Sequence, residues 1–466
     1  MIAREQGKTG SPFAVLVLAA GQGTRMVSAT PKVLHPLGGR PMIAYLLRLA
    51  NALKPSAIGL VVGHQEELIR KEVAGSAKAW GLTRPVAFIR QKELTGSGSA
   101  VVEALPFLKK YRTALVMCGD SPLLTFDTVY SLLGAHQRDK AQVTMLTARM
   151  PNPKGYGRIV RGPHGEVLRV VEETSATPKE AAITEVNSGT YCFETALLVS
   201  ALKQLRPQGP KQERYLTDCL EIIQRQGGRA GAYLAPSHEE VLGINSRVHL
   251  AQAERVLNRR ALERLMLSGV SVTDPAHTYA DSDVEVGQDS VLLPGTVLRG
   301  ATKIGSRCRI GPYACIENSS IGNESSVAFS QVVDARILEK CSVGPFSNIR
   351  PGSVLGPRAK VGNFSEIKAS KIGFGSKVPH LSYIGDAEIA EDVNVGAGTI
   401  TCNYDGVEKH KTVIGPKAFI GSNVNLVAPV KVGRGARIAA GSTVTEDVPE
   451  GALALARAQQ VNKIRK

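Results

Sequence analysis

The sequence has few aromatic residues, no long apolar run and no paired cysteine motif. Aromatic residues make up only 5% of its 466 residues. No run of eighteen or more apolar residues occurs, as a membrane-spanning helix would need, and the polar first twelve residues do not resemble a secretory signal. The seven cysteines are odd in number and show no CxxC spacing, as expected of free thiols in a reducing compartment. These absences predict a cytoplasmic protein with no membrane partner.

The basic residues do not cluster along the sequence, although the net charge is +16. The chain has no run of five or more basic residues, and no helix-turn-helix, zinc-finger or RNA-recognition signature. A basic chain is equally expected when the substrates are small polyanions, because cationic clefts raise their encounter rate. We therefore expect small polyanionic substrates rather than nucleic acid.

What the sequence does have is a six-residue repeat between residues 286 and 444. Aliphatic residues return at every sixth position in three unbroken phases, and glycine follows many of them. The phases are Val286, Leu292, Leu298, Ile304, Ile310, Ile316; then Val343, Ile349, Leu355, Val361, Ile367; then Ile414, Ile420, Leu426, Val432, Ile438, Val444.

The residues four positions after these aliphatics are mostly small, for example Ser290 and Ala314. Strand alternation places them on the same inward face as the aliphatic. A large and a small inward residue per short strand, with glycine at the bends, describes a chain that turns a corner every six residues. An ordinary all-β domain would not keep one phase through six repeats, so we predict a hexapeptide-repeat β-helix.

The N-terminal half alternates apolar runs with amphipathic segments. Residues 13–19 predict a strand buried on both faces, and further strands are expected at 58–62, 86–89 and 114–117, with a loop at 96–98. This alternation predicts a mostly parallel sheet with helices on both faces, whose ligands gather at the carboxyl ends of the strands. Asp120 follows such an end, where a carboxylate is either a natural Mg²⁺ ligand or a helix N-cap.

A helix with apolar residues three or four apart is expected at 246–267. Gly269 and Pro275 would end it. We interpret it as a linker, which predicts a first domain at 1–245, the linker at 246–270 and the β-helix at 271–466.

Several motifs resemble the signature of the nucleotidyltransferases that make sugar nucleotides. They are Leu-Ala-Ala-Gly-x-Gly-Thr-Arg-Met at 18–26, Pro-Lys-Val-Leu at 31–34, Gly-Tyr-Gly-Arg at 155–158, Val-Glu at 171–172, Asn-Ser-Gly at 187–189 and Gly-Ile-Asn at 243–245. With the hexad domain after them, residues 13–457 are similar to the bifunctional bacterial N-acetylglucosamine-1-phosphate uridyltransferase/glucosamine-1-phosphate acetyltransferase family. The order and spacing of the motifs over two fused domains make the resemblance specific.

The resemblance implies a Rossmann-like α/β nucleotidyltransferase domain followed by a left-handed parallel β-helix. It also implies two reactions: acetyl transfer from acetyl-coenzyme A to glucosamine 1-phosphate, then uridylyl transfer from UTP to the product, with release of pyrophosphate. The UDP-N-acetylglucosamine formed would supply precursors of peptidoglycan and lipopolysaccharide. Mg²⁺ as cofactor and a homotrimer are implied in the same way.

By this resemblance, fifteen positions would hold the nucleotide and sugar: Leu18, Ala19, Ala20, Gly21, Lys32, Gln91, Gly96, Ser97, Cys118, Gly119, Asp120, Gly157, Glu172, Asn187 and Asn245. Among these, Asp120 and Asn245 would bind Mg²⁺, and Arg25 would be catalytic with Lys32 against the phosphates. The sequence departs from the family at Gln22, where lysine is common, at Cys118, where tyrosine is frequent, and at Ser99, where histidine is usual. The first departure could weaken triphosphate binding.

The β-helix would carry the second site, with His380 as general base. The acceptor amine is largely an ammonium near neutral pH, and an imidazole is suited to take its proton. An insertion at 401–411 interrupts the repeats and predicts a binding loop. Glucosamine 1-phosphate would be bound by Arg350, Lys368, Tyr383 and Asn394, and acetyl-coenzyme A by Ala397, Asn403, Tyr404, Ser422, Ala440 and Arg457.

Two other functions remain open from the sequence. The first is a sugar-nucleotide pyrophosphorylase with a single activity, whose β-helix only assembles or regulates. The second is a polyanion-binding protein without catalysis, which predicts no dependence on Mg²⁺.

Overall fold

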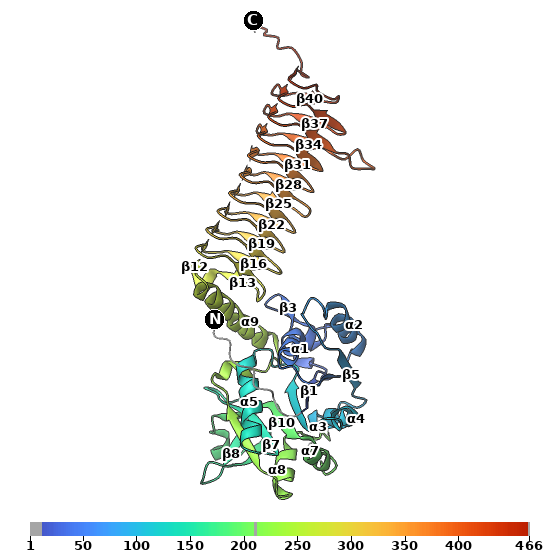
Figure 1. Cartoon of the computed structure of the whole chain (residues 1–466), viewed down its shortest axis with the longest axis vertical. Helices are drawn as coiled ribbons and strands as arrows, with labels where there is room; N and C mark the ends of the chain where they lie inside the picture. Colours follow the sequence, from blue (N-terminus) through green and yellow to red (C-terminus); the bar gives the residue numbers. More distant parts are fainter. Residues whose placement is uncertain (1–11, 209–211, 465–466) are drawn as a thin grey trace. The chain divides into compact units, whose positions relative to one another are not determined.

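The computed structural model describes residues 12–208 and 212–464. The chain divides into two compact units, Met1–Val256 and Leu257–Lys466 (Figure 1). Each unit has a hydrophobic interior of its own.

The N-terminal unit is built on a nine-stranded sheet with a main order of β11-β7-β10-β6-β1-β4-β5. Strands β5, β4, β1 and β6 are parallel neighbours, whereas β10 runs antiparallel to both β6 and β7. The strands are β1 Phe13–Leu18, β4 Ala57–Val62, β5 Val86–Arg90, β6 Thr113–Cys118, β7 Val143–Arg149, β8 Arg158–Arg161, β9 Val167–Val171, β10 Glu185–Glu194 and β11 Ala230–Leu234. The expected mostly parallel sheet is confirmed.

Strand β1 is buried on both faces, as its continuous apolar run predicts. Val15 and Val17 point into one cluster with helices α1 (Met42–Ala52), α2 (Glu66–Ser76) and α5 (Phe126–Arg138). Ala14 and Leu16 point into the other, with α3 (Ser97–Glu103), α4 (Leu105–Leu108), α7 (Thr195–Leu202) and α8 (Asp218–Arg225). This alternation covers the sheet with helices on both faces.

The loop expected at 96–98 is wrong, because helix α3 begins at Ser97. Gly96 caps the helix with a φ of 102°, a backbone conformation that glycine adopts readily. A distant segment fixes this start: the amide of Gly98 donates to the carbonyl of Arg214, and Ser97 Oγ accepts from the amide of Leu216. These contacts join segments more than one hundred residues apart, so the local sequence around Ser97 does not predict where the helix begins.

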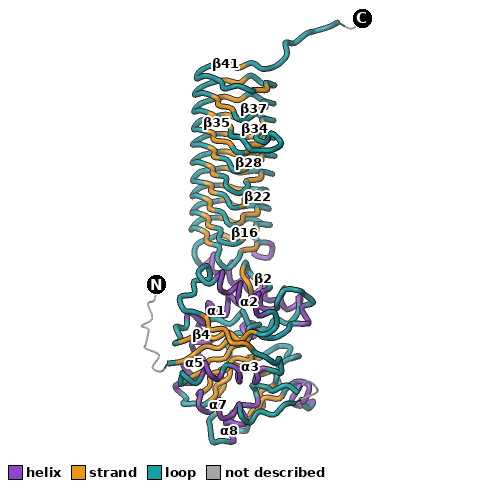
Figure 2. The backbone as a smooth tube through the Cα atoms, turned by 90° about the vertical axis from the view of Figure 1, so that its right-hand side faces the viewer, coloured by secondary structure: helices purple, strands orange, loops and turns teal. Residues whose placement is uncertain are grey.

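The C-terminal unit is a parallel β-helix with sheets of 11, 10 and 9 strands (Figures 1 and 2). One coil consists of β24 (Ser342–Val343), β25 (Asn348–Ile349) and β26 (Val354–Leu355), one strand in each sheet. In the next coil, Val361 pairs with Val343, three hexads earlier. The corners predicted at every sixth residue are therefore the corners of a triangular coil.

The aliphatic residues of the three phases fill the interior of the β-helix, and the small residues that share their face are also buried. Between Ile316 and Val343, where the phase breaks in the sequence, Ile321, Val327 and Ile337 continue the core. The spacing there falls to five residues in places, which is why a strict six-residue search loses it. The stack itself is continuous across the break.

The insertion leaves the stack as a loop between β34 (Ile400–Cys402) and β35 (Thr412–Ile414), visible beside the β34 label in Figure 1. Asp405 organises this loop, since its carboxylate accepts from the amides of Val407 and Glu408 and contacts His410 Nε2 at 2.7 Å. These hydrogen bonds lower the pKa of the Asp405 carboxyl.

Helix α9 (Arg247–Leu267) occupies the expected position, and its apolar residues Ala253, Leu257, Ala261 and Leu265 are buried. The domain limits at 245 and 270 remain a proposal. None of the helices in the described part of the chain combines the length and the apolar character needed to cross a bilayer.

Two candidate active sites

A cavity of about 520 Å³ lies at the carboxyl ends of the central strands of the N-terminal unit. Ten of the fifteen expected nucleotide and sugar positions line it: Leu18, Ala19, Ala20, Gly21, Lys32, Gln91, Gly96, Ser97, Cys118 and Asp120. They come from β1, β6 and the segments that follow β1, β5 and β6, so the sheet order brings them together. The backbone of Gly23, at a φ of 61°, packs so closely on Lys32 that a Cβ there would lie 2.7 Å from Lys32 Cβ.

Lys32, Asp120 and Asn245 form a polar group in this site. Lys32 Nζ donates to Asp120 Oδ2 at 2.6 Å and to Asn245 Oδ1 at 3.2 Å. The amide of Ile244 donates to the carbonyl of Asp120, which holds the segment carrying Asn245 beside β6. A carboxylate and an amide oxygen are hard ligands of the kind that Mg²⁺ prefers, and one cation, here the ammonium, already bridges them. The donor set therefore fits a divalent metal.

Gly157, Glu172 and Asn187 lie next to one another, although they do not line the cavity. The amide of Asn187 donates to the carbonyl of Gly157, and a Cβ on Gly157 would lie 3.5 Å from the Glu172 carboxylate. Burial, reinforced by the nearby charge of Asp218, raises the pKa of Glu172. Asn187 Nδ2 donates to the buried hydroxyl of Tyr191 at 2.6 Å, which fixes the orientation of the amide. These three residues therefore lie together beside β8 and β10.

Arg25 and Gly119 lie outside the cavity lining, whereas Cys118 is part of it. Arg25 lies in the short helix η1 (Thr24–Met26), is exposed and does not line the cavity. Gly119 connects β6 to Asp120, and its amide donates to the carbonyl of Leu18. Burial raises the pKa of the Cys118 thiol to about 12, so it is protonated, and it donates to the carbonyl of Gly189.

Ser99, the departure from histidine, is buried in the first turn of α3, where its hydroxyl donates to the carbonyl of Thr95. Two neighbours of the site were not expected from the sequence. Glu213 lines the cavity, and Thr217 Oγ1 approaches Glu172 Oε1 at 3.5 Å. Both belong to a segment that reaches the site only through tertiary folding, and no motif in the sequence marks them.

His380 lies at the end of β30 (Lys377–His380) and lines a second cavity of about 540 Å³. Asn394, Ala397, Ser422 and Ala440 line the same cavity. His380 Nδ1 lies 2.8 Å from Asn363 Oδ1, an acceptor, so Nδ1 carries the proton and Nε2 is the basic nitrogen. Asn363 was not predicted; it stands opposite His380 in the register of β27 (Lys360–Asn363) and β30.

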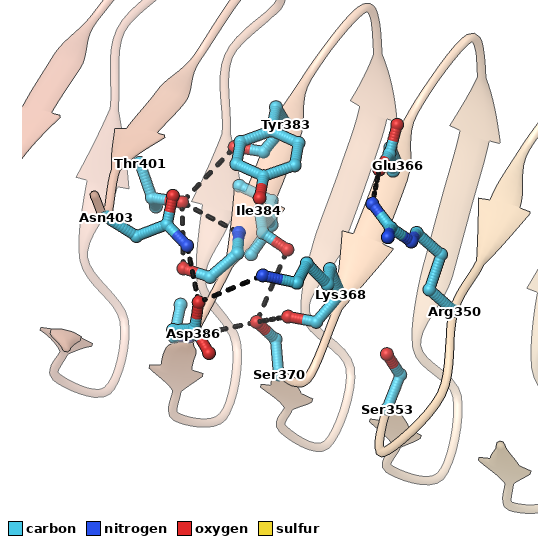
Figure 3. A network of polar contacts seen from close by, with 12 residues as sticks. Arg350, Ser353, Glu366, Lys368, Ser370, Tyr383, Ile384, Asp386, Thr401 and Asn403 are labelled. Carbon is cyan, nitrogen blue, oxygen red and sulfur yellow. Dashed lines mark hydrogen bonds and ion pairs between the residues drawn. The ribbon is translucent and has the colours of Figure 1, made fainter. Parts of the chain in front are cut away.

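A cation cluster lies on the neighbouring face of the β-helix, and Figure 3 shows most of its members. Arg350 Nη1 donates to Glu366 Oε1 at 2.6 Å, and Lys368 Nζ lies 3.5 Å from Asp386 Oδ2. Asn403 Nδ2 also donates to the Asp386 carboxylate. Strand β28 (Glu366–Lys368) carries the lysine, and Tyr383 begins the next strand of the same sheet, β31 (Tyr383–Gly385).

Lys409 of the insertion loop joins this cluster, although the sequence did not indicate it. The adjacent Lys368 ammonium lowers the pKa of Lys409, as expected when two like charges meet. Arg350, Lys368 and Lys409 thus gather three cationic side chains against two carboxylates, those of Glu366 and Asp386. Such an excess of positive charge suits a phosphate group.

The structure does not bring all expected residues of the second site into one cavity. Arg350, Lys368, Tyr383, Asn403 and Tyr404 do not line the cavity of His380. Tyr404 lies in the insertion loop, where its hydroxyl donates to the carbonyl of Gly406. Arg457 follows the last coil, and its Nη1 donates to the carbonyl of Ala440 at the cavity wall. Within one chain, the His380 cavity and the cation cluster belong to different sheets.

Two family models of transferases match separate parts of the chain. The family model described as Nucleotidyl transferase matches residues 14–238, and the model described as Bacterial transferase hexapeptide (six repeats) matches residues 411–446. The fold class inferred from the sequence, an α/β nucleotidyltransferase domain followed by a left-handed β-helix of hexapeptide repeats, is confirmed.

Proteins named "Bifunctional protein GlmU" are similar to this chain over almost its whole length. The protein from Geobacillus sp. (strain WCH70) is 46% identical over 96% of both chains. Those from Caldanaerobacter subterraneus subsp. tengcongensis and Exiguobacterium sp. (strain ATCC BAA-1283 / AT1b) are 47% and 48% identical, over 96% and 97% of this chain and 96% and 98% of their own. With both transferase models in the same order along the chain, this similarity shows that the chain belongs to the GlmU family of bifunctional transferases.

Proposed function

We propose that the chain makes UDP-N-acetylglucosamine in two steps, one in each unit. In the first, the amine of glucosamine 1-phosphate attacks the thioester of acetyl-coenzyme A, forming the amide and releasing the thiol. In the second, a phosphate oxygen of the N-acetylated sugar attacks the α-phosphorus of UTP and releases pyrophosphate. The observation that carries the proposal is the identity of 46–48% to bifunctional relatives across both units.

For uridylyl transfer, the proposed Mg²⁺ ligands are Asp120 and Asn245. When bound, the metal would neutralise charge that develops on the phosphates. Transfer of a phosphoryl-type group needs positioning and charge stabilisation more than covalent chemistry. Lys32 supplies a cation in the cavity, and Arg25 would supply a second once its exposed side chain turns inward. Gly157, Glu172 and Asn187 are proposed to hold the sugar.

For acetyl transfer, His380 is proposed as general base. Asn363 holds its Nδ1 proton, so that Nε2 is free to accept a proton from the attacking amine. Arg350, Lys368, Tyr383 and Asn394 would bind the sugar phosphate, and we add Lys409 to this set. Ala397, Asn403, Tyr404, Ser422, Ala440 and Arg457 are proposed to bind acetyl-coenzyme A.

We further propose that the chain acts as a homotrimer associated through its β-helix. A reason lies in the second site: one chain carries the His380 cavity and the cation cluster on different faces, so a neighbouring copy could complete the site. A cytoplasmic location is proposed because all seven cysteines are free thiols.

The test is incubation of the protein with glucosamine 1-phosphate, acetyl-coenzyme A, UTP and Mg²⁺, omitting one component at a time. The proposal expects N-acetylglucosamine 1-phosphate without UTP, and UDP-N-acetylglucosamine only with all four. A pyrophosphorylase with a single activity would require N-acetylglucosamine 1-phosphate to be added. A protein that binds polyanions without catalysis would form neither product.

A further inference from the structure

The Lys32 ammonium sits between the two oxygens that we propose as metal ligands. It donates to Asp120 Oδ2 at 2.6 Å and to Asn245 Oδ1 at 3.2 Å, and the Lys32 side chain is only 14% exposed. The lysine belongs to the short helix η2 (Lys32–Leu34), and its stem runs beneath Gly23 of the segment expected to meet the phosphates. A change of side-chain rotamer can therefore move the ammonium from the Asp120 and Asn245 oxygens to the segment expected to meet the phosphates.

An ammonium and a divalent metal compete for these two side chains, because two cations that approach the same oxygens repel one another at contact distance. Only Asp120 and Asn245 are proposed as protein ligands, and a Mg²⁺ ion held by one or two protein groups would depend on substrate phosphates and waters for its other ligands. Metal binding in the absence of nucleotide must therefore displace Lys32 and gains only these two protein ligands.

We propose that Lys32 couples metal binding to nucleotide binding. Before a triphosphate arrives, the ammonium neutralises Asp120 and occupies Asn245, which keeps a divalent metal out. A bound triphosphate gives the ammonium a more highly charged partner, and the flexible four-carbon stem allows it to move there. The two oxygens then become available to the metal that the phosphates bring. This inference rests on the proposed uridylyl transfer site.

Because coupling between two ligands is reciprocal, metal and nucleotide each strengthen the binding of the other. The consequence is that the metal-binding oxygens are engaged only when a nucleotide is present. Lys32 would act in this step as a switch between two anionic partners rather than as a fixed phosphate ligand.

The test measures Mn²⁺ binding to the full chain by electron paramagnetic resonance without nucleotide. We expect weak binding to the wild type, and binding at least about fivefold tighter to Lys32→Met and Lys32→Gln, the lower end of typical coupling between two ligands. Lys140→Met is the matched control, since it removes one exposed cation before β7, at the opposite end of the strands. Its Mn²⁺ affinity should change by less than about twofold, because solvent and salt screen this distant charge from the metal site.

A second arm adds UTP and follows protein-bound Mn²⁺ by water proton relaxation. If the wild type takes up Mn²⁺ with UTP, but neither Lys32 variant binds Mn²⁺ alone more tightly than the wild type, the coupling role is refuted and the metal site stands. If the wild type takes up no Mn²⁺ even with UTP, the proposed metal site itself is wrong. The two failures are therefore distinguishable.

Discussion

At the scale of single residues, the proposed chemistry of both sites depends on contacts that the fold creates. Asp120 is the carboxylate nearest to Lys32 in the nucleotide cavity, and Asn363 is the partner that orients His380. In each case a polar side chain is held by one other side chain from a different strand or segment. Substitution of one member therefore tests the role of the other.

Asp120→Ala should abolish most uridylyl transfer and leave acetyl transfer unchanged. The variant loses a proposed Mg²⁺ ligand, and loss of one preorganised charge-stabilising group typically costs about 10²–10³-fold in rate. Both activities are measured on the same preparation, so acetyl transfer serves as the control. Retention of most uridylyl transfer at low Mg²⁺ would show that the metal is held elsewhere.

His380→Ala should lower acetyl transfer by about 10²–10⁴-fold, the usual contribution of a general base. Asn363→Ala should lower it less, because the imidazole remains but its basic nitrogen is no longer fixed. Rates are compared across pH 6 to 9, with uridylyl transfer as the internal control. A His380→Ala variant that acetylates at the wild-type rate over this range would make His380 structural.

His136 should make the stability of the N-terminal unit depend on pH. It is buried on α5 with Nδ1 2.9 Å from Thr144 Oγ1, and burial lowers its pKa from 6.5 to about 4. Between these two values the unfolded chain binds more protons than the folded one, so stability falls as the pH drops from 6.5 towards 4. The shift corresponds to a loss of roughly 3 kcal/mol in the free energy of unfolding as the pH falls through this range.

A variant without the imidazole, His136→Gln, should lose less stability on acidification than the wild type. Thermal unfolding of the first unit is compared at pH 7, 5.5 and 4.5, and the quantity of interest is the difference between wild type and variant. The unfolding temperature of the wild type should fall relative to that of the variant at each step from pH 7 to pH 4.5. Parallel curves would assign the acid sensitivity to other groups.

At the scale of elements, the insertion loop and two stacked strands of the second unit bring residues of the proposed site together. The insertion between β34 and β35 brings Lys409 to Lys368, and the adjacent strands β27 and β30 bring Asn363 to His380. The regular coils on either side provide a rigid support, since their strands pair in register along the stack.

Asp405→Ala should loosen the insertion loop and raise the KM for glucosamine 1-phosphate. The carboxylate accepts from the amides of Val407 and Glu408 just before Lys409, so its loss frees the cation that the loop positions. A rise of about three- to tenfold, with kcat little changed, corresponds to roughly 1 kcal/mol of lost positioning.

Protonation of Asp405 in the wild type should loosen the insertion loop in the same way, but only at low pH. The hydrogen bonds hold the pKa of Asp405 below its usual value, so the loop is stabilised above the unfolded pKa and loosens only as the pH falls below it. The KM of the wild type should be insensitive to this group near neutral pH. An Asp405→Ala variant with an unchanged KM would show that the loop does not position the acceptor.

At the scale of the whole molecule, the two units should work independently. A fragment ending at Val256 retains Asn245 together with Arg247, which contacts His35 Nδ1 of the same unit at 3.3 Å. It should be monomeric and still uridylylate N-acetylglucosamine 1-phosphate, whereas the full chain should sediment as a trimer. A fragment that stayed trimeric would place the association surface in the first unit.

Local sequence determined most of the architecture of this protein. The hexads predicted the β-helix because one inward residue per corner is a short-range pattern, and the apolar run at 13–19 predicted a central strand for the same reason. The motifs at 18–26 and 31–34 were local as well, and ten of the expected positions line one cavity.

Only the tertiary structure decided which of these residues meet. Lys32 contacts Asp120 and Asn245 across 88 and 213 residues of sequence, and His380 reaches Asn363 because one coil of the β-helix separates them. Helix α3 begins where the distant backbone of Arg214 fixes it. Such contacts depend on strand order and register, which pair segments far apart in the chain and leave no periodic signal in either segment.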